Sequence, residues 1–268
     1  MNTVTSADGT TIAYTKEGSG SGPAMVAVNT SLEDHNGMAG IASLLSDDFT
    51  VYRYDRRGRG ESGNTEPYSP QREIEDLEAV IAEAGGAAAL ISGSGGCVLS
   101  LDAATALGEK VTGLYLYEPP FIIDDSRPPV PNDLVERVSK LVAGDQRDEA
   151  VEAFFVEAVG VPAEFIDGMK ADPSWQGMKE NAHTLPYDVE ICQPTQRGQE
   201  LPADRWDVSV PATVSVGGDS EPFFHSGAKA LADLLPKGRY KSLEGLDHGA
   251  FWMAPDTVAE DARNDLNG

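Results

Sequence analysis

The chain has 268 residues, 44 of them acidic and 20 basic, which gives a formal net charge of −24 at pH 7. Because Lys and Arg are needed to displace the counterions of phosphate groups, this composition excludes nucleic acid as an expected partner and disfavours anionic membranes. The acidic residues are spread along the chain, which indicates a solvated, self-repelling surface rather than an acidic tail.

The first 120 residues alternate between predicted strands and helices. Asp8-Gly9 precedes the run 11–14, a pattern typical of a β-hairpin. Helices are predicted over residues 71–84 and 98–107, where apolar side chains recur at helical spacing. Four apolar runs are predicted strands: residues 24–28, 49–54, 87–91 and 111–117. This alternation predicts a parallel sheet with helices on both faces.

The sequence changes character after Phe121. Residues 121–205 contain Pro-rich breaks and amphipathic helical stretches but no convincing strand. This pattern predicts a helical lid inserted into one core, which is made of residues 1–120 and 206–268. Sheet elements return after the insertion, with strands at 212–216 and 239–243 and helices at 226–235 and from about residue 255.

Export signals, membrane spans and metal-ligand spacings are not visible in the sequence. There is no run of about 18 apolar residues, and no basic N-terminal segment precedes an apolar stretch. The two cysteines, Cys97 and Cys192, form neither a metal spacing nor a disulfide framework. We therefore expect a cytoplasmic protein with reduced thiols and no metal or organic cofactor.

Ser94 is the strongest candidate for a nucleophile. It is the central residue of Ser92-Gly93-Ser94-Gly95-Gly96, between the strand at 87–91 and the following helix. A nucleophile on a sharp strand-to-helix turn requires small residues two positions before and after it, and the free N–H groups of the helix suit an oxyanion. The alternatives are a plain Gly/Ser-rich loop or a phosphate cradle, although no GxGxxG or G-K-[ST] is present.

His248 is the candidate base that a serine hydroxyl needs at neutral pH. It lies in the loop 245–249, directly after the last predicted strand. In an open parallel sheet the carboxyl ends of the strands meet at one crevice, so His248 and Ser94 are expected to lie together.

Four segments far apart in the chain share a pattern: residues 54–63, the turn around Ser94, residues 117–121 and residues 245–249. Together they resemble the α/β-hydrolase superfamily. The resemblance implies an α/β-hydrolase fold with a lid and a Ser–His–acid hydrolase that forms an acyl-enzyme. The chain resembles the epoxide hydrolases and haloalkane dehalogenases less closely, because those enzymes attack with a carboxylate where this chain has Ser94. Arg56, Arg57 and Arg59 of the first segment are expected to brace their loop through ion pairs.

The expected oxyanion hole departs from the family pattern. The resemblance implies that the backbone N–H groups of Gly95 and Ser31 hold the oxyanion. The family usually has His-Gly just before the residue that corresponds to Ser31, whereas this chain has Asn29-Thr30. The side chains of Asn29 and Thr30 are therefore an alternative lining of the site.

Two carboxylates are candidates for the acid that orients His248. The family's common position falls on Ser220, one residue after Asp219, and its other position is the end of the preceding strand, which holds Glu118. We favour Glu118 and keep Asp219 as the alternative. Either has only to fix the imidazole tautomer and stabilise the imidazolium.

The favoured function is a serine hydrolase that cleaves a small, largely apolar ester, lactone or thioester. One alternative is a lyase, isomerase or cyclase that uses His248 as acid and base, and another is a binding protein of the same fold without turnover. The expected partner in each case is a small molecule. The sequence leaves the oligomeric state open.

Overall fold

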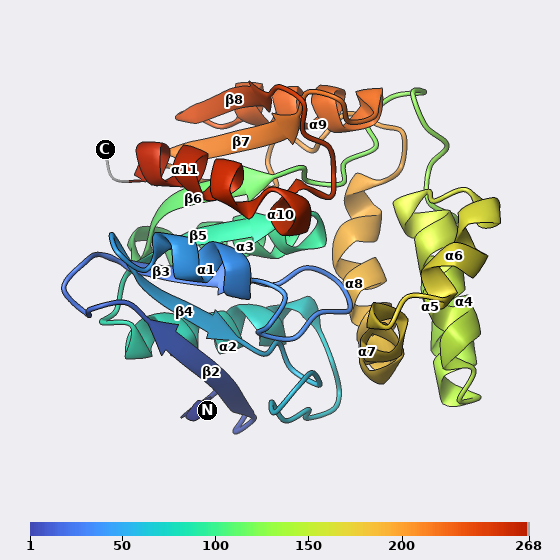
Figure 1. Cartoon of the computed structure of the whole chain (residues 1–268), viewed down its shortest axis with the longest axis horizontal. Coiled ribbons are helices and arrows are strands. Elements are labelled where there is room, and N and C mark those ends of the chain that lie inside the picture. The colour runs from blue at the N-terminus through green and yellow to red at the C-terminus, as the bar shows by residue number, and fades with distance from the viewer. Residues whose placement is uncertain (267–268) are drawn as a thin grey trace.

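A computed structural model of the protein describes residues 1–266 and has an eight-stranded sheet at its centre (Figure 1). The strand order is β1-β2-β4-β3-β5-β6-β7-β8. β1 pairs antiparallel with β2, and β2 with β4, whereas all the other pairs are parallel. The strands are β1 (Asn2–Thr5), β2 (Thr11–Glu17), β3 (Ala24–Val28), β4 (Thr50–Tyr54), β5 (Ala88–Gly93), β6 (Val111–Tyr117), β7 (Ala212–Gly217) and β8 (Gly238–Leu243). The predicted α/β class is confirmed.

Helices cover both faces of the sheet, so the central strands are apolar on both sides. Along β3, Met25 and Ala27 pack toward one face, while Val26 and Val28 pack toward the other. The first face is covered by α1 (Ala39–Leu45), α10 (Ala250–Met253) and α11 (Pro255–Leu266). The second face is covered by α2 (Pro70–Glu83), α3 (Gly95–Leu107) and α9 (Pro222–Leu234).

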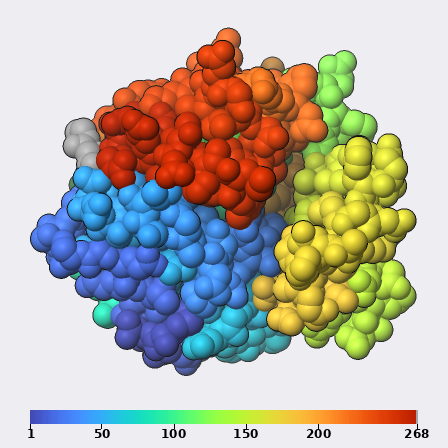
Figure 2. Space-filling view, in the orientation of Figure 1, coloured from blue at the N-terminus to red at the C-terminus, as the bar shows by residue number. Residues whose placement is uncertain are grey.

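Between β6 and β7 the chain forms helices and loops, which lie beside the carboxyl ends of the strands (Figures 1 and 2). Five α-helices belong to this inserted segment: α4 (Leu134–Ala143), α5 (Arg147–Ala153), α6 (Ile166–Lys170), α7 (Ser174–Asn181) and α8 (Leu185–Cys192). A π-helical turn, Phe154–Val159, continues α5. None of the helices described over residues 1–266 is long and apolar enough to cross a membrane.

A buried ion network joins the inserted segment to the core. Asp188 of α8 accepts two hydrogen bonds from Arg59 (2.7 and 2.8 Å) and one from Arg56 (2.8 Å). Arg56 also donates to both carboxylate oxygens of Glu73 in α2, at 2.5 and 2.7 Å. Arg57 is paired in the same way with Asp76. The expectation that these arginines brace their loop through ion pairs is confirmed.

Some elements differ from the sequence prediction. Helix α1 was not predicted, because its seven residues are too short to show a helical repeat. Helix α9 begins at Pro222, four residues before the predicted start, since proline fits the first turn of a helix. In the inserted segment, residues 147–159 form α5 followed by the π-helical turn rather than one continuous α-helix.

Candidate active site

Ser94 lies on the sharp turn between β5 and α3. Its backbone has φ 49° and ψ −128°, a strained conformation for a residue with a side chain. The turn brings backbones close together: a Cβ on Gly96 would lie 2.8 Å from the carbonyl oxygen of Val28. The Ser94 N–H donates to the Tyr117 carbonyl at 2.9 Å, which ties the turn to the end of β6. The hydroxyl is thereby held at the N-terminus of α3.

His248 and Glu118 are joined by a hydrogen bond of 2.7 Å between Nδ1 of the ring and Oε2 of the carboxylate. Glu118 follows β6 directly and is fully buried, with a left-handed backbone (φ 52°). Its other oxygen, Oε1, accepts from the backbone N–H of Gly217 at 2.7 Å and from the hydroxyl of Ser220. Both carboxylate oxygens are therefore satisfied by donors, as a buried anion requires.

Asp219 lies elsewhere. Its side chain is exposed, and its backbone N–H donates to the Leu246 carbonyl at 2.9 Å. Within residues 1–266 no hydrogen bond joins its carboxylate to His248. The structure therefore brings Glu118, and not Asp219, to the imidazole. Ser220, at the family's usual acid position, donates to Glu118 instead.

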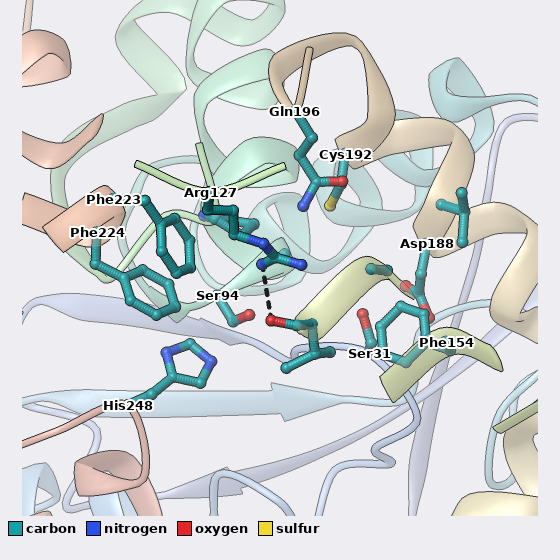
Figure 3. A pocket seen from close by; sticks show the side chains of 15 residues that line it. Ser31, Ser94, Arg127, Phe154, Asp188, Cys192, Gln196, Phe223, Phe224 and His248 are labelled. Atoms are coloured by element: carbon teal, nitrogen blue, oxygen red, sulfur yellow. Dashed lines mark hydrogen bonds between the residues drawn. The ribbon is translucent and has the colours of Figure 1, made fainter. Parts of the chain in front are cut away.

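The imidazole of His248 is half-buried and stacks on the ring of Phe224, with 4.6 Å between the ring centroids. Nδ1 is bonded to Glu118, whereas Nε2 has no hydrogen-bond partner among the described residues. His248 and Ser94 line the same pocket, and Figure 3 shows them next to each other. The histidine is therefore fixed on one side and available on the other.

Gly95 and Ser31 meet beside Ser94. A Cβ on Gly95 would lie 3.4 Å from the Ser31 hydroxyl and 3.1 Å from Sγ of Cys192. The side chain of Asn29 is turned away from this place, because it is fully buried and donates to the Tyr54 carbonyl at 2.8 Å. Asn29 therefore does not line the site, whereas Thr30 lines part of it.

Two cavities open on Ser94 and His248. The first is narrow, with a volume of about 30 Å³, and is lined by the inserted segment together with Phe223 and Phe224 of α9 (Figure 3). The second is larger, with a volume of about 440 Å³, and is mostly apolar, with Met169, Met178 and Trp252 in its wall. A small molecule bound beside Ser94 and His248 therefore has space on two sides.

The family now follows from a direct comparison: residues 20–261 match the alpha/beta hydrolase family. The chain belongs to that family. The predicted α/β-hydrolase is thereby confirmed, with its sheet and covering helices.

Solved structures and a curated protein are similar to this alpha/beta hydrolase. An alpha/beta hydrolase from Sphaerobacter thermophilus is 43% identical, with a TM-score of 0.91 over 99% of this chain and 100% of that one. The esterase RhEst1 from Rhodococcus is 22% identical (TM-score 0.71, 100% of this chain, 98% of that one), which shows the fold alone. A curated protein of Mycobacterium tuberculosis, "Probable oxidoreductase EphD", is 37% identical over 83 residues. That match spans 30% of this chain and only 14% of the mycobacterial protein.

Arg127 and Glu33 are two of the pocket residues of this alpha/beta hydrolase that the sequence did not predict. Arg127 enters the first cavity, and Glu33 lines the second. Burial raises the pKa of Glu33 to about 7, although Trp252 donates to its carboxylate at 2.6 Å. Neither residue belongs to a local motif, so no pattern in the sequence marks them.

One cluster outside the cavities has metal-ligand chemistry. Ligand atoms of Asp34, His35 and Asp55 lie within 4.8 Å of one another. However, Asp55 Oδ1 accepts from the backbone N–H and Nδ1 of His35 (2.7 and 2.8 Å), and Oδ2 accepts from the Glu61 N–H (2.9 Å). The protein's own donors therefore explain this buried carboxylate.

Proposed function

We propose that the protein is a serine hydrolase that cleaves small carboxylic esters, lactones or thioesters. The observation that carries the proposal is the 2.7 Å hydrogen bond between His248 and the buried Glu118, next to the strained turn of Ser94. The nucleophile thus comes from the end of β5, the orienting acid from the end of β6 and the base from the loop after β8. Acyl transfer requires these three groups together.

In the proposed reaction the Ser94 Oγ attacks the substrate carbonyl while Nε2 of His248 takes the hydroxyl proton. Glu118 holds the ring in the tautomer with hydrogen on Nδ1 and stabilises the imidazolium. The backbone N–H groups of Gly95 and Ser31 receive the negative charge on the carbonyl oxygen. His248 then protonates the departing alcohol, which leaves an acyl group on Ser94. A water molecule, deprotonated by His248, releases the acid and restores the serine.

We propose that residues 121–205 act as the lid of this site, over a core of residues 1–120 and 206–268. Support comes from Phe154 and Val159, which the segment contributes to both cavities. Because both cavities have largely apolar walls, the substrate is expected to be a small, mainly apolar molecule. The two buried, unpaired thiols fit a reducing compartment, which supports the proposed cytoplasmic location.

The test of this function is labelling and substitution of Ser94. A fluorophosphonate probe is expected to modify Ser94, and Ser94→Ala is expected to lower the cleavage of p-nitrophenyl butyrate by at least about 1000-fold. Ser43→Ala, an exposed serine on α1, is the control and should keep full activity. Undiminished ester turnover by Ser94→Ala would refute the proposal and leave acid–base chemistry on His248 as the alternative.

A further inference from the structure

We infer that Arg127 is a specificity-determining residue that binds a carboxylate on the substrate, so the preferred esters or lactones are acidic ones. This inference rests on the proposed hydrolase function and narrows its substrates. It begins from the placement of one cation. Arg127 is the only Lys or Arg among the residues that line either cavity beside Ser94.

Arg127 forms no ion pair with any carboxylate of the described residues, and Glu221 acts on its charge only from a greater distance. The buried arginines of the core, Arg56, Arg57 and Arg59, are each paired with carboxylates. Arg127 instead donates to two neutral backbone carbonyls, of Val159 at 2.7 Å and of Glu157 at 3.5 Å. Arg127 is therefore a half-buried guanidinium whose hydrogen bonds go to neutral groups, so its charge remains available to an anion.

The surroundings hold the guanidinium in place. Its carbon lies 5.0 Å from the centre of the Phe223 ring, and the bond to Val159 fixes one nitrogen (Figure 3). Gly160 makes room for it, since a Cβ there would lie 2.8 Å from the guanidinium carbon. Burial lowers the pKa of Arg127, and Glu221 is the acid that opposes this shift. The side chain is therefore positioned before any ligand binds.

The other charged group in this cavity does not compete for an anion. Asp188 lines the same cavity, but its carboxylate is occupied by Arg56 and Arg59. Arg127 therefore provides a positive site opposite apolar walls, including Phe154 and Phe224. A guanidinium presents two parallel N–H donors that match a carboxylate, and it binds this group more strongly when water is excluded. Hence an acidic substrate gains a contact that its neutral counterpart lacks.

The test compares matched acidic and neutral esters. The monomethyl esters of succinate, glutarate and adipate carry a carboxylate, whereas the corresponding dimethyl esters do not. Wild type is expected to have a higher kcat/KM on at least one monomethyl ester than on its dimethyl counterpart. Arg127→Met should lower kcat/KM for that monomethyl ester by about 10- to 100-fold and change the dimethyl ester by less than about 3-fold.

Two further variants separate charge from geometry. Lys229→Met removes one positive charge from an exposed position on α9 and should leave the preference unchanged. Arg127→Lys keeps the charge without the planar fork and should retain part of the preference. An equal loss on both esters in Arg127→Met would assign a structural role to Arg127 and overturn the inference. The inference is also overturned if wild type shows no preference for a monomethyl ester over its dimethyl counterpart at any chain length.

A binding measurement keeps this inference distinct from the proposed function. Adipate and glutarate are titrated calorimetrically into Ser94→Ala and into the double variant Ser94→Ala/Arg127→Met. Binding that is at least about 10-fold weaker in the double variant supports a carboxylate site even if no ester is hydrolysed. Equal binding by both variants overturns it, whatever the ester assays show.

Discussion

Glu118 has both carboxylate oxygens engaged, one by His248 and the other by the Gly217 N–H and the Ser220 hydroxyl. Glu118→Gln keeps the shape but can present an amide N–H to Nδ1, which selects the wrong imidazole tautomer. Ester turnover is expected to fall by about 100- to 10,000-fold. Asp219→Asn, the matched control, should change it by less than about 3-fold.

Steady-state kinetics on p-nitrophenyl butyrate, with circular dichroism to verify folding, check this expectation. A folded Glu118→Gln variant with normal turnover, alongside an inactive Asp219→Asn variant, would transfer the acid role to Asp219. The exposed position of Asp219 argues instead that Glu118→Gln loses turnover and Asp219→Asn keeps it.

At single residues, the sequence predicted the geometry that is encoded locally. The small residues around Ser94 specify the turn by themselves, and the place of His248 after the last strand follows from the parallel sheet. Arg127 was missed because its environment is assembled from Val159, Gly160 and Phe223, which are far away in the sequence. An unpaired charge becomes visible only when all possible partners have been placed in space.

Among the elements, α8 and the loop after β4 are tied together by Asp188, which is 2% exposed. Asp188→Asn removes the negative charge and leaves Arg59 buried without an acidic partner. Breaking a buried ion pair in this way is expected to lower the free energy of unfolding by about 3–5 kcal/mol. Denaturant unfolding followed by fluorescence measures the change.

The control for Asp188→Asn is Glu136→Gln, because the ion pair of Glu136 and Lys140 on α4 is exposed to solvent. Its removal should change stability little, since water screens such a pair. Wild-type stability in Asp188→Asn would show that the network contributes nothing to holding the inserted segment.

Helices and strands were predicted where their hydrophobic pattern in the sequence was strong. The central strands were found because both of their faces are buried, which makes them continuous apolar runs. In the inserted segment, α4 shows a clear amphipathic pattern, whereas α6 and α7 are five and eight residues long. Such short helices are stabilised by packing on their neighbours rather than by their own sequence pattern, so their existence was not predictable.

The whole molecule carries a net charge of −24, and this repulsion acts against the compact state because folding brings the charges closer together. Salt screens exposed charges, with a Debye length of about 30 Å at 0.01 M and about 10 Å at 0.1 M, but it hardly reaches buried pairs such as Arg59 with Asp188. Raising NaCl from 0.01 to 0.2 M is therefore expected to raise Tm by about 2–4 °C, equivalent to about 1 kcal/mol.

Calorimetry over this range distinguishes screening from ion-specific effects, which continue to grow well above 0.2 M. KCl at the same ionic strength is the matched control and should give the same shift, because screening depends on charge and concentration alone. A Tm that falls with salt would mean that exposed attractive pairs, such as Lys110 with Glu78, outweigh the excess of acidic groups. The even spread of those groups over the chain argues for a rise, because 44 acidic residues face only 20 basic ones.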